Sequence, residues 1–172
     1  MAAPKSALTV GNRTLQVTNL DKVLWPRDGY TKGDLIAYYR AVSKWLLPHV
    51  QHRPLTLERY PNGIDAAGWW EKHIPKGLPD WVATVKTAAS TRHEQIEFIL
   101  GEDEATLAYV ANLATIVLHV WYSREPTLDV PDFVLIEDVA HERDGPAGVL
   151  DRLQHGRISF ISVYQGIDPV AW

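Results

Sequence analysis

The chain has 172 residues, of which 46% are apolar and 22% charged, a composition typical of one globular domain. It contains no cysteine, which excludes disulfides, thiolate catalysis and Cys-bound zinc. No run approaches the roughly 18 apolar residues of a membrane span, and no secretion signal opens the chain. We therefore expect a cytoplasmic protein with no membrane partner.

The net charge of −4 hides an uneven distribution along the chain. Residues 1–100 carry 13 Lys and Arg against 9 Asp and Glu, whereas residues 101–172 carry 4 against 12. A polyanion would be attracted to the first part and repelled by the second. The acidic part is interpreted as a solvated face unless specific carboxylates converge in it.

The elements alternate irregularly, which predicts one α+β domain over residues 1–172, with a mixed or antiparallel sheet flanked by helices. Thr31 and Asp34 form a capping-box pattern, after which apolar residues recur at helical spacing until Pro48. In chain order we predict a hairpin over 7–18 about Gly11-Asn12, a helix over 32–47, a strand at 55–60, a loop at 68–80, strands at 81–87 and 94–100, a helix over 102–115, strands at 116–122 and 133–138, a short helix at 147–154 and a strand at 157–164.

The first candidate site is the start of the helix that begins near Lys32. A helix N-terminus attracts anions through its free N–H groups and its dipole, and a lysine adds its charge. If the preceding loop folds back, Asn19 and Lys22 would join Lys32 around one phosphate. The alternative is a capped helix with two exposed lysines, which spacing alone favours.

The second candidate is the adjacent pair Trp69 and Trp70, in a loop that also carries Lys72, His73 and Lys76. An exposed indole beside cations can stack on a nucleobase. The alternative is that both rings cover an edge of the core.

Two strands carry further candidates. His119 alternates with Trp121 on a predicted strand, where a histidine is more often a hydrogen-bonded core residue than a catalytic one. Glu137 and Asp138 end an apolar strand, but adjacent residues on a strand point to opposite faces. They make a poor metal pair unless the strand ends or bulges there.

Together these segments resemble the polymerase domain of bacterial ligase D, a family of the archaeo-eukaryotic primase superfamily that fills ends during non-homologous end joining. The resemblance covers about residues 8–135 in colinear order, and its specificity is high because six motifs fall in sequence. The motifs lie at 17–26, 31–35, 53–56, 59–63, 72–77 and 118–121.

The resemblance implies roles residue by residue. Asn19, Lys22 and Lys32 match the family's pocket for the 5′-phosphate at a DNA break. Trp69 and Trp70 fall where the family has paired phenylalanines that stack near the break. His119 matches a histidine near the incoming nucleotide, and Arg59 matches a basic residue of the active-site region.

The sequence also departs from the family pattern. The family's Asp-x-Asp motif, which holds Mn²⁺ or Mg²⁺, aligns with Glu137 and Val139, and valine cannot bind metal. Glu58 stands where a basic residue is expected. Nothing in 139–172 matches the family's triphosphate motif or third metal aspartate, so this tail is interpreted as divergent.

The main functional hypothesis is therefore a module that binds DNA with a 5′-phosphate at a gap or end, with weak or no polymerase activity, and that associates with the bacterial nucleoid when bound to DNA. The alternative is a minimal Mn²⁺-dependent nucleotidyltransferase in double-strand break repair, in which Asp132, His141 or Asp144 completes a site at Glu137 and Asp138. A third, weaker hypothesis is a partner of Ku or a DNA ligase, using exposed aromatic residues near Trp172.

Overall fold

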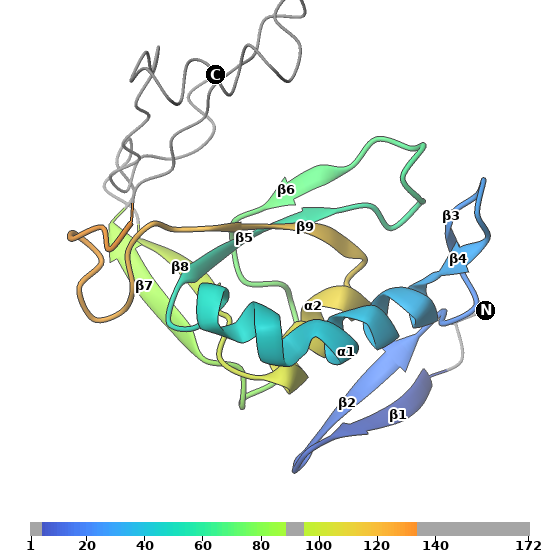
Figure 1. The fold of residues 1–172 in the computed structure, drawn as a ribbon, viewed down its shortest axis with the longest axis horizontal. Coiled ribbons are helices and arrows are strands. Elements are labelled where there is room, and N and C mark those ends of the chain that lie inside the picture. The colour runs from blue at the N-terminus through green and yellow to red at the C-terminus, as the bar shows by residue number, and fades with distance from the viewer. Residues whose placement is uncertain (1–4, 89–94, 134–172) are drawn as a thin grey trace, which may run out of the picture.

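The computed structural model describes residues 5–88 and 95–133 (Figure 1). The elements that these residues form are β1 Lys5–Val10, β2 Arg13–Thr18, β3 Val23–Trp25, β4 Tyr30–Thr31, α1 Lys32–Val50, β5 Pro54–Arg59, β6 Trp69–Glu71, β7 Thr84–Ala88, β8 Gln95–Leu100, α2 Glu104–Asn112 and β9 Thr115–Val120.

The N-terminal hairpin and the first helix form as their sequences predict. β1 and β2 pair antiparallel about a turn in which Gly11 has a φ of 58°, a conformation that glycine adopts without strain. Thr31 caps α1, and the side chains of Thr31 and Asp34 each bond the other's backbone N–H, so the predicted capping box is present.

The prediction that Pro48 ends the helix is wrong. Pro48 lies inside α1, which continues to Val50. A proline removes one backbone donor, which the last turn of a helix can tolerate. The turn still closes through the bond from Gln51 N to Leu47 O, 2.8 Å long.

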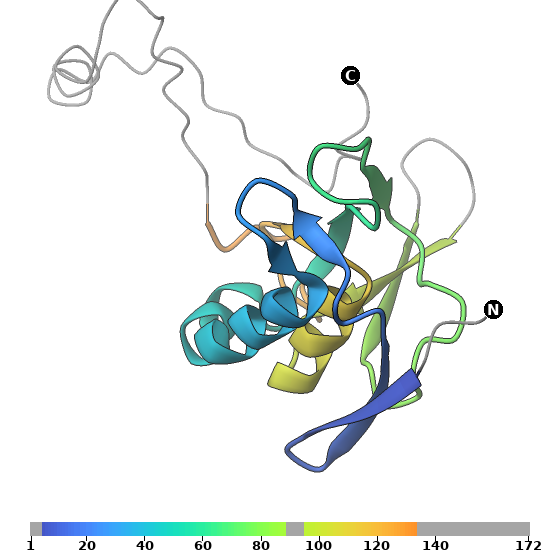
Figure 2. The ribbon, with the colours of Figure 1, turned by 90° about the vertical axis from the view of Figure 1, so that its right-hand side faces the viewer.

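The five-stranded sheet is antiparallel at every described pairing, in the order β6-β5-β8-β7, with β9 also paired to β5. Leu55 and Leu57 of β5 are almost fully buried and belong to the same core as apolar residues of α1 and α2. The two helices lie side by side against the sheet (Figure 2). Side chains that alternate with Leu55 and Leu57, such as Glu58, therefore face away from the helices.

The predicted α+β class, with an antiparallel sheet flanked by helices, is confirmed. Several details differ. Trp69 to Glu71 form a strand inside the predicted loop, β7 begins at Thr84, and α2 ends at Asn112 because Ala114 takes a φ of 58° that no helix accommodates. The elements predicted at 147–154 and 157–164, and all but Phe133 of the strand at 133–138, lie outside the described residues.

Candidate nucleic-acid interface

The loop before α1 folds back over the start of the helix. Asn19, with a φ of 53°, begins a tight turn closed by the bond from Lys22 N to Asn19 O. The N–H groups of Lys32 and Gly33 then donate to the carbonyl oxygens of Lys22 and Leu20, each at 2.8 Å. Asn19, Lys22 and the start of α1 are thus brought together, as the phosphate-pocket hypothesis requires.

The same contacts change how an anion could be held there. The first three N–H groups of α1 are all satisfied, two by the loop and that of Asp34 by the Thr31 hydroxyl. The expectation that free N–H groups of the helix end contact a phosphate is therefore wrong. The loop that contains Lys22 supplies the carbonyl oxygens that accept from N–H groups which are otherwise free at a helix N-terminus. Side chains, rather than these three N–H groups, would therefore have to bind an anion at this position.

Lys32 is 5% exposed, and its amine donates to Asn112 O at 2.9 Å and to Thr18 Oγ1 at 3.4 Å. Both acceptors are neutral. Burial, followed by the fields of Lys22 and Arg59, lowers the pKa of Lys32 to about 8. The amine thus sits in a positive environment with one of its three donors unused by any described residue.

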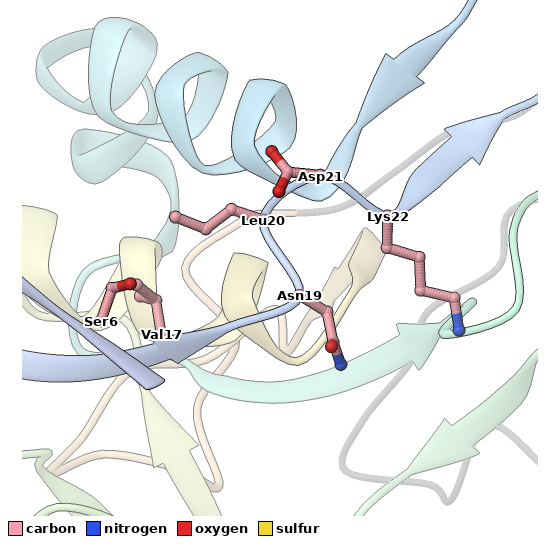
Figure 3. Close-up of a pocket in the computed structure, with 6 residues that line it drawn as sticks. All are labelled: Ser6, Val17, Asn19, Leu20, Asp21 and Lys22. Atoms are coloured by element: carbon pink, nitrogen blue, oxygen red, sulfur yellow. The ribbon is translucent and has the colours of Figure 1, made fainter. Parts of the chain in front are cut away.

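Lys22 is exposed, and its amine donates to Asn62 Oδ1 at 3.2 Å. Asn19 and Lys22 line a pocket of about 490 Å³ with Ser6, Val17, Leu20 and Asp21, and Lys32 is not among the residues that line it. Figure 3 shows that Asn19 and Lys22 extend to the same side of the loop, whereas the carboxylate of Asp21 points the other way. Lys22 is therefore the cation on this side of the loop, and Asp21 is the one acidic residue among those that line the pocket.

Arg59 lies on the helix-facing side of β5 and is mostly buried. It donates to Leu113 O at 2.9 Å and forms an ion pair with Glu71, and its guanidinium lies 5.1 Å from the ring centre of Trp69. The charge of Arg59 helps to lower the pKa of Lys32, whereas His119 lies on the opposite face of the sheet.

Trp69 and Trp70 point to opposite faces of β6, and 44% and 42% of their surfaces are exposed. Both residues are therefore partly exposed on a strand at the edge of the sheet. Trp70 stacks on His119, with ring centres 4.1 Å apart and an interplanar angle of 25°.

His119 contacts a carboxylate as well as Trp70. Its Nε2 lies 3.1 Å from Glu58 Oε2, and the hydroxyl of Tyr60 donates to Glu58 Oε1. These hydrogen bonds, that from Tyr60 first, lower the pKa of Glu58. Glu58, which stands where a basic residue is expected, thus forms a small hydrogen-bonded cluster with Tyr60 and His119.

The metal ligands suggested by the sequence are not assembled among the described residues. Glu137, Asp138, His141 and Asp144 lie outside them, and residues 5–88 and 95–133 contain no group of three acidic or histidine side chains able to hold a metal. Asp132 is described, and its Oδ2 accepts from Arg53 at 2.7 Å and from Arg124 at 2.8 Å. Two guanidinium groups already engage this carboxylate, so the described part of the chain does not fit Mn²⁺ or Mg²⁺.

Sequence reasoning missed Asn62, Asn112 and Tyr60 as contributors. Asn62 follows Pro61 in a motif that signals only a turn, and Asn112 acts through its carbonyl oxygen, which no side-chain pattern reveals. Tyr60 stands two residues after Glu58, a spacing that could have indicated a shared face.

Comparison with known proteins identifies the class. Residues 31–138 match the family model described as the LigD primase-polymerase domain, so the chain belongs to that family. It is 34% identical over 113 residues to the multifunctional non-homologous end joining DNA repair protein LigD of Mycobacterium tuberculosis, covering 65% of this chain and 14% of that protein. It is 33% identical over 140 residues to the bifunctional non-homologous end joining protein LigD of Bacillus subtilis, covering 74% of this chain and 22% of that one.

The fold agrees with a solved relative, the polymerase domain from Mycobacterium tuberculosis ligase D in complex with DNA. That structure matches with a TM-score of 0.60 and 30% identity, over 74% of this chain and 41% of the other. The predicted family resemblance is confirmed. Among the described residues, no helix is long and apolar enough to cross a membrane.

Proposed function

We propose that this chain binds DNA ends or gaps that carry a 5′-phosphate, through Lys22, Lys32 and Asn19, with weak or no polymerase activity. The observation that carries the proposal is the buried amine of Lys32, which has only neutral partners and lies in the field of two further cations. Burying such an amine without a carboxylate is costly, and a phosphate dianion would offset that cost.

The remaining contacts suit a terminal phosphate better than a continuous DNA backbone. Lys22 is the exposed cation and Lys32 the buried one, and the proposal places a single phosphate group between their amines. The whole chain has a net charge of −4, which limits the number of backbone phosphates it can neutralise. We expect modest affinity, with a slope of log affinity against log salt of roughly −2 to −3.

The test compares binding to a gapped duplex with and without the 5′-phosphate. Wild-type protein is expected to prefer the phosphorylated duplex by about tenfold or more. Lys22→Ala should reduce that preference to near one, whereas Lys44→Ala should leave it unchanged. Lys44 is a matched control because it lies on the same helix, twelve residues or about 18 Å beyond Lys32. Equal affinity of the wild type for both duplexes would refute the proposal.

The family to which the chain belongs favours a second candidate, a Mn²⁺-dependent nucleotidyltransferase that uses Glu137 and Asp138. Primer extension with labelled nucleotides in Mn²⁺ or Mg²⁺ tests it. Extension that disappears in Glu137→Ala/Asp138→Ala would establish this activity, and undiminished extension would exclude these carboxylates.

The chain spans about 14% of the length of the mycobacterial relative, whose name describes several functions. A role beside Ku or a DNA ligase is therefore a separate part of the proposal. Capture of purified Ku or ligase in the absence of DNA would support it, and capture only through DNA would contradict it.

A further inference from the structure

Three side chains from three adjacent strands meet on the face of the sheet that points away from the helices. Glu58 of β5 is directly opposite Trp70 of β6, and His119 of β9 is opposite Thr56, two residues before Glu58. Side chains at directly opposed positions share a face. The strand register therefore places Glu58 on the strand between that of Trp70 and that of His119.

The contacts form a chain that ends at the indole. The Tyr60 hydroxyl donates to one oxygen of Glu58, the other oxygen lies 3.1 Å from His119 Nε2, and the imidazole stacks on Trp70 at 4.1 Å. An ionised carboxylate only accepts hydrogen bonds, so His119 Nε2 carries the proton. The imidazole is therefore held by Glu58 on its edge and by Trp70 on its face. The ring cannot turn without breaking the hydrogen bond to Glu58.

Trp70 remains 42% exposed although the imidazole covers one side of its ring. The uncovered side is therefore the one that faces solvent. An indole held in this way loses little conformational freedom when a planar group stacks on it, which increases the affinity of the stack.

We propose that Glu58 is a positioning residue that acts through His119 to hold Trp70 as a platform for an unpaired nucleobase. The ligand class is a single-stranded base of the DNA whose 5′-phosphate Lys22 and Lys32 are proposed to bind, so this inference rests on the proposed function. In this arrangement His119 supports the indole of Trp70 from one side. Glu58, which stands where a basic residue is expected, keeps His119 in place on the proposed DNA-binding surface.

Trp69 provides an internal comparison because its ring is supported differently. It lies on the other face of β6, where the Arg59 guanidinium covers it. Loss of the Glu58 carboxylate should therefore disturb stacking at Trp70 and leave Trp69 unaffected.

The experiment uses the full chain with a gapped, 5′-phosphorylated duplex that carries 5-iodouracil at the unpaired template position. Irradiation crosslinks the base to an aromatic ring against which it stacks, and tandem mass spectrometry identifies the residue. Saturating protein makes the yield report geometry rather than affinity. Glu97→Ala is the matched control, because Glu97 is a carboxylate of the same sheet that accepts from a neighbouring hydroxyl, that of Thr84.

We expect wild-type crosslinking at Trp70, a yield lowered about fivefold in Glu58→Ala, and a yield within about twofold of wild type in Glu58→Gln, whose amide can still bond Tyr60 and His119. Tyr60→Phe removes only the hydroxyl that fixes Glu58 and should lower the yield about twofold, which keeps the proposal testable if Glu58→Ala does not fold. Wild-type yield in Glu58→Ala, or an equal loss in Glu97→Ala, would overturn it.

The preference for the 5′-phosphate is measured on the same variants and separates the two proposals. If Glu58→Ala loses the crosslink and keeps the phosphate preference, both stand. If the wild type shows phosphate preference without a crosslink at Trp70, the platform is refuted and the phosphate site stands. If the crosslink depends on Glu58 while the phosphate has no effect, the platform stands and the phosphate site is refuted.

Discussion

The amine of Lys32 donates to the carbonyl oxygen of Asn112 at 2.9 Å, which joins the first turn of α1 to the last residue of α2. The two residues are 80 positions apart. The bond fixes a positive charge at the meeting point of two helices and of the hairpin residue Thr18. The charge is therefore held rigidly before any ligand arrives.

The phosphate preference should depend on pH in a direction set by Lys32. A phosphate pairs with the ammonium form, and the pKa of Lys32 in the free protein is about 8. The preference should be constant below that pH and fall as the pH rises above it, by up to about tenfold per pH unit. The 5′-phosphate itself is already a dianion in this range, since its second pKa is about 6.

Affinities for the gapped duplex with and without 5′-phosphate, measured between pH 7 and 9.5, check this expectation. A preference that is flat up to pH 9.5 would show that Lys32 does not contact the phosphate. The non-phosphorylated duplex controls for every other pH effect on binding.

The stability of the free protein should change with pH in the opposite sense. The folded pKa of Lys32 lies below its ordinary value of 10.5, so between these values the unfolded chain binds more protons. The free energy of unfolding should therefore increase from pH 8 to 9.5, by about 2 kcal/mol. Urea denaturation of wild type and Lys32→Met measures this increase. If Lys32→Met shows the same increase as the wild type, a group other than Lys32 causes it.

Asn62 should matter for binding without mattering for stability. Its side-chain oxygen holds the amine of Lys22 at 3.2 Å on the surface. Asn62→Ala should weaken the phosphate preference about two- to fivefold, since a surface hydrogen bond contributes roughly 0.5–1 kcal/mol. Asn12→Ala, at the exposed hairpin turn, is the control for a lost surface asparagine. The gapped-duplex assay reads both, and an unchanged preference in Asn62→Ala would mean that Lys22 needs no such support.

Local patterns predicted the hairpin at Gly11, the capping box at Thr31 and Asp34, and the existence of both helices, because each depends on residues close together in the sequence. The same reasoning missed β3 and β4, whose three and two residues are too short for a periodic signal. It placed Trp69 and Trp70 in a loop because the flanking glycines and prolines obscured a three-residue strand.

The candidate site illustrates what spacing leaves undetermined. That Lys22 and Lys32 lie together follows from a loop that folds back, which the sequence allowed but did not require. The occupied N–H groups of α1 and the bonds of Lys32 to Asn112 and Thr18 depend on how distant segments pack. The contact between Glu58 and His119 follows from strand register, which no local pattern specifies.

Asp132 should contribute to stability through its two arginine partners. Arg53 is 3% exposed, and removal of the carboxylate leaves its guanidinium buried with one partner fewer. Asp132→Asn should lower the free energy of unfolding by about 1–3 kcal/mol. Asp129→Asn, an exposed carboxylate three residues earlier, should change it by less than about 0.5 kcal/mol.

Protonation of Asp132 at low pH should lower the free energy of unfolding of the wild type, as Asp132→Asn does. Desolvation acts to raise the pKa of Asp132, but the hydrogen bonds from Arg53 and Arg124 outweigh it and lower the value. A carboxylate with a lowered folded pKa stabilises the protein above its ordinary pKa and loses that effect as the pH falls through the folded value. The difference in free energy of unfolding between wild type and Asp132→Asn, measured by urea denaturation, should therefore decrease as the pH falls from 6 to 3. A difference that stays constant would contradict the ion pairs.

Gly68 should tolerate no side chain, although it is exposed. A Cβ at this position would lie 2.7 Å from Tyr60 Cε1 and 2.9 Å from Arg59 O, and the second of these is backbone that cannot rotate away. Gly68→Ala should therefore displace the Tyr60 ring, weaken its bond to Glu58 and lower the free energy of unfolding by about 1–3 kcal/mol. Ala67→Ser, at the exposed neighbouring position, should have little effect. Urea denaturation measures both variants. Equal stability of Gly68→Ala and Ala67→Ser would contradict this prediction.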